Sequence, residues 1–242
     1  MRQRTARYLL FLGALIWTVA LTSCGKDESE EIIIEYGTLS DIENNQYVTV
    51  KIGDQWWMAE NLRTSKFNDG TPLTYIGIEE EDTVWSSNQE VAYAYINDSI
   101  LGYLYNGKVV MSDKNIAPEG WHIATDEDWK KLEETIGIPD SELDQTGWRG
   151  EDEGEKLVSK YSAGWPEGGL IFGSDAYGFN ALPGGCRIHD GRTNVSGNTA
   201  FWWTKSDTDN ELWYRYIDIN NRKIFRQHIL KQYGMSIRCV KD

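Results

Sequence analysis

Cys24 is the residue whose chemistry is clearest from its position. It closes the run Leu21-Thr22-Ser23-Cys24, which directly follows an apolar stretch from Tyr8 to Ala20. Three arginines and no acid precede that stretch. A basic start, a short apolar core and small residues before the cut make up a secretory signal. The apolar run is too short for a transmembrane helix, which needs about 20 residues. We therefore expect residues 1–23 to be removed as a signal peptide.

The residues around Cys24 resemble the lipobox of bacterial lipoproteins. The resemblance implies that the Cys24 thiol is diacylated, so that the mature chain hangs from a membrane by acyl chains such as palmitate. Residues 25–31 are small, polar and acidic, a composition typical of a solvated tether. Together with Cys24 they also resemble the export tag of surface lipoproteins of the Bacteroidota. We expect a signal peptide over 1–23, an acidic flexible tether over 24–44 and a domain over 45–242. The expected location is the outer membrane, at the cell surface, with its periplasmic face as the alternative.

The histidines do not form a catalytic set in the sequence. The three are His122, His189 and His228, and no metalloprotease motif, nucleophile elbow or phosphate loop accompanies them. The few cysteines and histidines also lack zinc-ligand spacing. Because a base needs a placed partner, we expect His122 to make a structural hydrogen bond. His189 lies in a glycine-rich loop beside Asp190, where it is either plain loop or a ligand contact. We expect a protein without catalysis.

The charge of the chain bounds its partners. Its net charge is −14, which argues against nucleic acid and against adsorption to anionic lipid. The N-terminal lipid should therefore be the only membrane contact. Acidic clusters at 79–82, 151–153 and 207–211 supply the oxygen ligands that calcium needs, but none has the spacing of a known calcium loop. Calcium stays an alternative, and no other cofactor is expected.

Periodicity indicates strands in the first and last parts of the chain, with one clear helix between them. Thr125 and Asp128 form a near capping box at the start of that helix, and Gly137 ends it. Gly53-Asp54 between two apolar runs predicts a tight hairpin. A second helix is expected near 154–161. Alternation predicts strands at 47–52, 201–204, 212–219, 223–229 and 235–240.

Six motifs follow one another along the chain. They are 52–62, 102–106, 117–129, 178–187, 201–204 and 234–242. This series resembles the Fibrobacter succinogenes major paralogous domain family over residues 46–242. The family occurs on secreted proteins and surface lipoproteins, and it has no established enzymatic activity.

The cysteines depart from that family's pattern. The family usually has a cysteine where this chain has Ala117, and a large residue where it has Cys186. An exported setting favours disulfides, so the departures imply a bridge between Cys186 and Cys239. Two buried free thiols are the alternative.

The helix and tryptophan motifs also resemble the C-type lectin-like fold, as an analogy of fold alone. That resemblance implies an α+β domain with two helices, short antiparallel sheets and long glycine-rich loops. It also implies that the first and last strands, 47–52 and 236–240, pair side by side. The loops of the second half would then face away from the membrane.

Carbohydrate binding is the function that the aromatic residues favour. Sugars pack their C–H faces on flat rings, while Asp, Asn and Arg bind their hydroxyls. Trp202 is the first choice for an exposed ring, because it occupies a variable position of the family beside Trp203. Burial is the alternative for every tryptophan, since Trp is highly buried on average. Arg187 and Arg238 are expected to anchor carboxylates. The full set of expected ligand contacts is Trp148, Trp165, Trp202, Trp213 and His189.

The sequence thus predicts a surface-exposed outer-membrane lipoprotein that binds an extracellular glycan or protein without catalysis. A structural component of the cell surface, such as an adhesin or a fimbria-associated subunit, is the alternative. A hydrolytic or calcium-dependent enzyme comes third.

Overall fold

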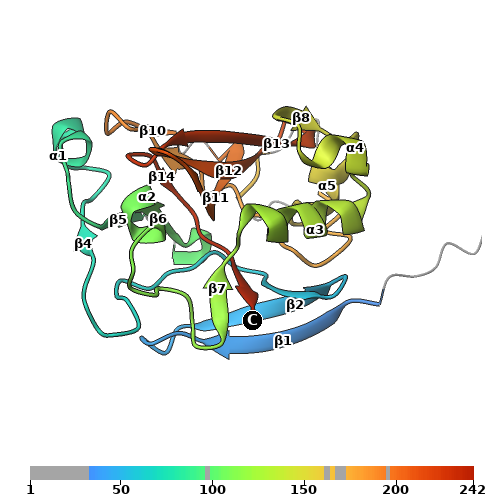
Figure 1. The fold of residues 1–242 in the computed structure, drawn as a ribbon, viewed down its shortest axis with the longest axis horizontal. Coiled ribbons are helices and arrows are strands. Elements are labelled where there is room, and N and C mark those ends of the chain that lie inside the picture. Colours follow the sequence, from blue (N-terminus) through green and yellow to red (C-terminus); the bar gives the residue numbers. More distant parts are fainter. Residues whose placement is uncertain (1–32, 96–98, 161–163, 167–172, 195–196) are drawn as a thin grey trace, which may run out of the picture. The chain divides into compact units, whose positions relative to one another are not determined.

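Strands form most of the regular structure of the chain. A computed structural model describes residues 33–95, 99–160, 164–166, 173–194 and 197–242. Cys24 and the expected signal peptide lie outside the described residues. Strands take 39% of the described residues and helices 16%, in three sheets and five short helices (Figure 1). The expected α+β, C-type lectin-like class is therefore wrong. Segments that alternate in the sequence form strands of up to ten residues, and the architecture is mainly β.

The first sheet contains strands from both ends of the described chain. Its order is β1 (Glu35–Ser40), β2 (Gln46–Ile52), β3 (Gln55–Met58), β15 (Cys239–Lys241) and β7 (Trp121–Ile123), all antiparallel. Gly53, at φ +59°, turns β2 into β3, so the predicted hairpin is confirmed. Because β3 lies between β2 and β15, the expected pairing of the first and last strands is wrong. β1 also lies within residues 24–44, so part of the expected tether is an edge strand.

Two further sheets complete the fold. The second has the order β10 (Thr193–Asn194), β9 (Cys186–Arg187), β14 (Gly234–Met235), β6 (Tyr103–Asn106), β5 (Ala92–Tyr95) and β4 (Thr74–Tyr75). The third has the order β11 (Thr199–Thr208), β12 (Glu211–Asp218), β13 (Asn221–Leu230) and β8 (Gly147–Arg149). Figure 1 shows the third sheet on the opposite side of the domain from β1 and β2.

Helix α3 (Asp126–Ile136) is the longest helix and begins as the sequence predicts. The Thr125 hydroxyl accepts a hydrogen bond from the Asp128 amide, and the Asp128 carboxylate accepts one from the Thr125 amide. Gly137, at φ +118°, ends the helix. The predicted second helix is the shorter α5 (Glu153–Leu157). The other helices are α1 (Asp82–Ser86), α2 (Gly107–Val110) and α4 (Asp140–Leu143). Within the described ranges, no helix is long and apolar enough to cross a bilayer.

Arg187 and Arg238, two of the fully buried arginines, bind loops to the sheets. Each is without solvent exposure, and each guanidinium donates to backbone carbonyl oxygens at 2.7–3.0 Å. The acceptors are Met58, Phe179 and Asn180 for Arg238, and Ile76, Gly77 and Gly191 for Arg187. The expectation that these arginines anchor carboxylates is therefore wrong. Burial lowers the pKa of Arg238 to about 9, so its guanidinium stays charged at neutral pH.

Candidate functional site

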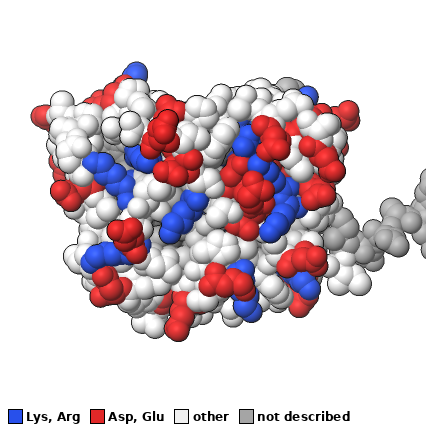
Figure 2. Space-filling view, viewed as in Figure 1, with Lys and Arg blue, Asp and Glu red and all other residues white. Residues whose placement is uncertain are grey.

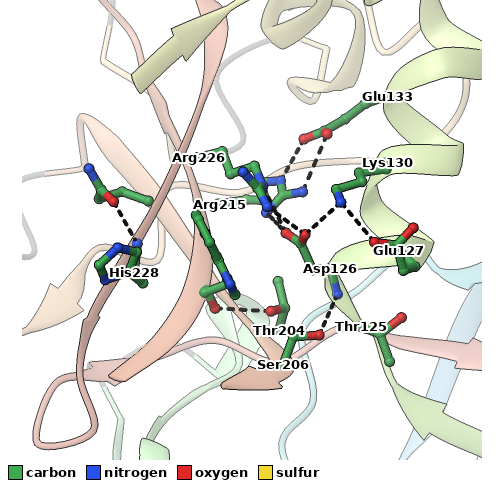
Figure 3. A network of polar contacts seen from close by, with 12 residues as sticks. Thr125, Asp126, Glu127, Lys130, Glu133, Thr204, Ser206, Arg215, Arg226 and His228 are labelled. Atoms are coloured by element: carbon green, nitrogen blue, oxygen red, sulfur yellow. Dashed lines mark hydrogen bonds and ion pairs between the residues drawn. The ribbon is translucent and has the colours of Figure 1, made fainter. Parts of the chain in front are cut away.

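A buried cluster of titratable side chains joins α3 to the third sheet (Figure 3). Glu133 accepts hydrogen bonds from Arg149 and Arg215, at 2.6–3.3 Å. Asp126 accepts from Arg215 and Arg226, at 2.7–3.0 Å. All five residues are buried. Burial raises the pKa of Asp126, but its hydrogen bonds with the arginines and their charges outweigh burial and hold that pKa well below its usual range. Arg149 Nε is buried without a partner, but both carboxylates are held by arginines and no side chain of the cluster is open to a ligand, so we interpret this cluster as structural.

Trp213 lies beside this cluster and is half-buried. Its ring centroid is 3.7 Å from the guanidinium carbon of Arg226, so the guanidinium covers one side of the ring. The ring of His228 also contacts Trp213, edge-on, with 5.0 Å between the ring centroids. His228 Nδ1 in turn contacts the Glu211 carboxylate. Trp213 therefore offers a ligand less ring surface than the sequence suggests.

His122 holds two parts of the chain together. Its Nδ1 lies 2.7 Å from the Asp242 carboxylate, and its Nε2 lies 3.0 Å from the carboxylate of Asp128, the capping residue of α3. The hydrogen bond to Asp128, followed by that to Asp242, raises the pKa of His122. These contacts give the ring the structural role that the sequence predicts.

Trp202 and Trp165, two of the predicted ligand contacts, are core residues. Trp202 is 0% exposed, and its Nε1 donates to Asn61 Oδ1 at 2.9 Å. Its ring packs against Trp129 of α3 at 5.7 Å between centroids. Trp165 is 7% exposed and donates to the Ala181 carbonyl at 3.0 Å. The prediction that these rings meet a ligand is wrong, because the helix α3 and the loop around Ala181 cover them.

The cysteines are also buried, as free thiols. Cys186 lies on β9 of the second sheet and Cys239 on β15 of the first. The expected bridge between them is absent from the structure, in which the thiols pack in one apolar cluster. Burial raises the pKa of Cys186 to about 12 and that of Cys239 further, so both thiols stay protonated and unreactive at neutral pH.

His189 is the predicted ligand contact nearest to the second sheet. It is exposed, in the loop between β9 and β10, and its ring tilts against Tyr233 at 5.2 Å between centroids. The neighbouring Asp190 is paired with Arg192 at 2.7 Å. The contacts of His189 fit a surface loop and do not distinguish between the two roles expected for it.

Trp148, the last of the predicted contacts, is exposed and belongs to a row of four rings. The row crosses the third sheet in direct register, since Phe201 pairs with Tyr216, Tyr216 with Phe225, and Phe225 with Trp148. Trp148 is 37% exposed and the other three are half-buried. Successive centroids lie 4.4, 5.9 and 5.1 Å apart. We call these four residues the aromatic row.

A second group of rings lies on β4, β5 and β6 of the second sheet. Register places Tyr75 beside Tyr93, Tyr93 beside Tyr105, and Tyr95 beside Tyr103. Side chains two apart on a strand share a face, so all five project from the same side of the sheet. We call these five tyrosines the tyrosine surface. Tyr75 and Tyr95 are stacked 5.0 Å apart and are 41% and 37% exposed, while Tyr105 is buried beneath the others.

Polar groups border the tyrosine surface. The Tyr93 hydroxyl is hydrogen-bonded to Ser65, and the Ser65 hydroxyl donates to the Glu43 carboxylate at 2.9 Å. The Tyr75 and Tyr95 hydroxyls share a hydrogen bond. Burial, that hydrogen bond and the charge of Glu79 raise the pKa of Tyr75 to about 12. The surface therefore combines partly exposed rings, neutral hydroxyls and ionised carboxylates.

Sequence reasoning missed the tyrosine surface, although its signal is present. Tyr93 and Tyr95 alternate along one strand, and Tyr103 and Tyr105 along the next. The alternation shows that each pair shares a face, but the pairing of the strands is needed to bring the two pairs together.

The described residues show mixed charge and no metal site. On the face that carries α3 and β7, Lys and Arg side chains lie next to Asp or Glu (Figure 2). Across the described part of the chain, no group of three or more His, Cys, Asp or Glu is placed to hold a metal ion. The exclusion of nucleic acid stays a prediction.

The family of the chain follows from comparison with known proteins. A family model described as the Fibrobacter succinogenes major domain matches residues 50–241. No curated protein and no solved structure matches the chain. The match begins within β2 and spans the rest of the first sheet, together with the second and third sheets and the described helices. The chain therefore belongs to the Fibrobacter succinogenes major domain family.

Proposed function

We propose that this chain is a surface lipoprotein that binds an extracellular glycan, without catalysis, through the tyrosine surface. The observation that carries the proposal is the stacked pair Tyr75 and Tyr95, both more than one third exposed on the face that also holds Tyr93 and Tyr103. Tyrosine supplies rigid, amphipathic contact area at a small cost in conformational entropy. Its ring suits the C–H face of a sugar, and its hydroxyl can donate to or accept from sugar hydroxyls.

The polar border of the tyrosine surface supports the same proposal. Binding sites for small molecules combine apolar and aromatic walls with a few placed polar groups. Here Ser65 and Glu43 lie against the rings, and Glu43 is fixed by hydrogen bonds from the Ser65 amide at 2.6 Å and the Thr64 hydroxyl at 3.0 Å. A fixed carboxylate can accept hydrogen bonds from sugar hydroxyls without first losing side-chain freedom.

Binding experiments with single variants test the proposed site. We expect Tyr75→Ala and Tyr95→Ala each to weaken glycan binding about tenfold, or about 1.4 kcal/mol, because each removes an exposed ring. Tyr95→Phe, which keeps the ring and removes the hydroxyl, should lose less. Affinities on a glycan array, followed by calorimetry with the full-length chain in detergent, measure these effects.

Trp148→Ala is the matched control, since it removes an equally exposed ring from a different sheet. It should leave glycan affinity unchanged. Loss of binding in Trp148→Ala with none in the tyrosine variants would move the glycan site to the aromatic row and contradict this proposal.

A structural or adhesin role is the second candidate, and the aromatic row favours it. Phe201, Phe225 and Trp148 bring apolar rings to the surface of the third sheet, which lies opposite β1 and β2 in Figure 1. Exposed apolar patches are typical of protein–protein contact sites. The chain would then bind a protein of the cell surface, and the glycan array would give no signal.

The proposal also includes a lipid anchor at Cys24 and a place outside the cytoplasm. The signal pattern around Cys24 supports it. We expect metabolic labelling with palmitate to mark the wild-type chain and to leave Cys24→Ala unmarked. Equal labelling of both, or of neither, would contradict the anchor.

A further inference from the structure

We infer that the tyrosine surface selects uncharged glycans and rejects anionic ones such as polyuronates and sulfated sugars. The inference rests on the proposed function, since it specifies the ligand of the same site. Its evidence is the charge around the rings, which is separate from the exposure of the rings themselves.

Carboxylates flank the tyrosine surface on two sides. Glu43 lies on the Ser65 side, close enough to Tyr93 and Tyr103 that its charge acts on both hydroxyls. Glu79 lies on the Tyr75 side. Its carboxylate folds back over the Gly77 backbone, where a Cβ atom would meet Glu79 Oε1 at 2.2 Å. An anionic sugar on the rings would therefore meet negative charge at both borders.

Two cations near the rings, Arg63 and Lys66, are already paired, and a third, Arg187, interacts with Tyr75 but is 0% exposed and cannot contact a bound sugar. Arg63 lies over the ring of Tyr47 at 4.4 Å and donates to Glu60 at 3.3 Å and to the Gln46 carbonyl. Lys66 lies 3.5 Å from Glu43. A carboxylated or sulfated sugar usually needs a free Arg or Lys to bind its charge, and neither Arg63 nor Lys66 is free.

The hydroxyls themselves carry no charge at neutral pH. Burial raises the pKa of Tyr93 and Tyr103, and the charge of Glu43 raises it further. The tyrosine hydroxyls are therefore neutral hydrogen-bond donors and acceptors, and they can replace the water molecules that bind sugar hydroxyls. This arrangement suits a neutral glycan, which is rich in hydroxyls. The carboxylate or sulfate of an anionic glycan would be buried there without a partner.

The test compares neutral gluco-oligosaccharides with oligogalacturonides of equal length on the full-length chain. At low ionic strength we expect the anionic series to bind at least about tenfold more weakly. The difference should shrink at high salt, because salt screens exposed charges over distances of about 10 Å. Glu79→Lys should narrow the difference between the two series severalfold.

Glu134→Lys on α3 is the matched control, because it makes the same change in net charge at an exposed position on the other side of the domain. It should leave both affinities near wild type. Equal binding of the two sugar series at low salt, or equal effects of Glu79→Lys and Glu134→Lys, overturns the inference alone. If neither series binds, the proposed function falls, and the inference falls with it.

Discussion

Glu133→Gln should lower the free energy of unfolding by about 3–5 kcal/mol, the usual cost of removing one partner of a buried ion pair. Glu133 is 0% exposed and accepts four hydrogen bonds from Arg149 and Arg215. Glutamine keeps the shape but carries no charge, and its amide nitrogen meets guanidinium donors instead of accepting from them. Two arginines would then stay buried with one fewer negative charge to balance them. Chemical denaturation followed by circular dichroism measures the loss.

Glu134→Gln is the control for that measurement. The residue is adjacent on α3 and exposed, so its substitution should change stability by less than about 0.5 kcal/mol. If the two variants unfold at the same denaturant concentration, Glu133 does not balance buried charge as its position indicates.

Asn61→Leu should destabilise the chain by about 3 kcal/mol or more, because it strands two buried donors at once. Asn61 Oδ1 accepts from Trp202 Nε1 at 2.9 Å and from Arg238 Nε at 2.8 Å. Its Nδ2 donates to the Leu101 carbonyl at 2.8 Å. Leucine has a similar size but no polar atom. The cost of an unpaired donor is about 1–3 kcal/mol, and it is larger for a charged group such as Arg238.

Asn61→Asp is the matched control for Asn61→Leu. The aspartate keeps an acceptor for both donors and places a negative charge beside Arg238, which has no carboxylate within hydrogen-bonding distance among the described contacts. We expect it to retain more stability than Asn61→Leu. Equal loss in both variants would show that the hydrogen bond to the Leu101 carbonyl, which both variants lose, and not the unpaired donors, sets the cost.

Local features of the fold were predictable because their causes are local. The capping box of Thr125 and Asp128 and the turn at Gly53 depend on residues a few positions apart. The order of the strands depends on contacts between distant segments. No residue near β2 in the sequence indicates that β3 lies between β2 and β15. The fold class was predicted wrongly for the same reason, because the proportion of strand also depends on distant contacts.

The candidate site was predictable only in part. Trp148 is exposed as expected, but Trp202 is not, because a strand with large residues on both faces gives no sign of which face is covered. In β11 both faces are covered: α3 lies over Trp202, and the apolar cluster that holds Cys186 and Cys239 packs against Trp203. Whether Arg187 and Arg238 meet carboxylates or carbonyls likewise depends on loops that are distant in sequence.

The position of β1 has a mechanical consequence for an anchored protein. β1 is the edge strand of its sheet, is joined along its length to β2, and exposes most of its side chains. If the chain carries the proposed lipid at its N-terminus, a pulling force on that lipid would reach this strand first. Because little apolar area holds β1, it would detach from β2 before the other two sheets deform, so that the rest of the domain would stay folded under load.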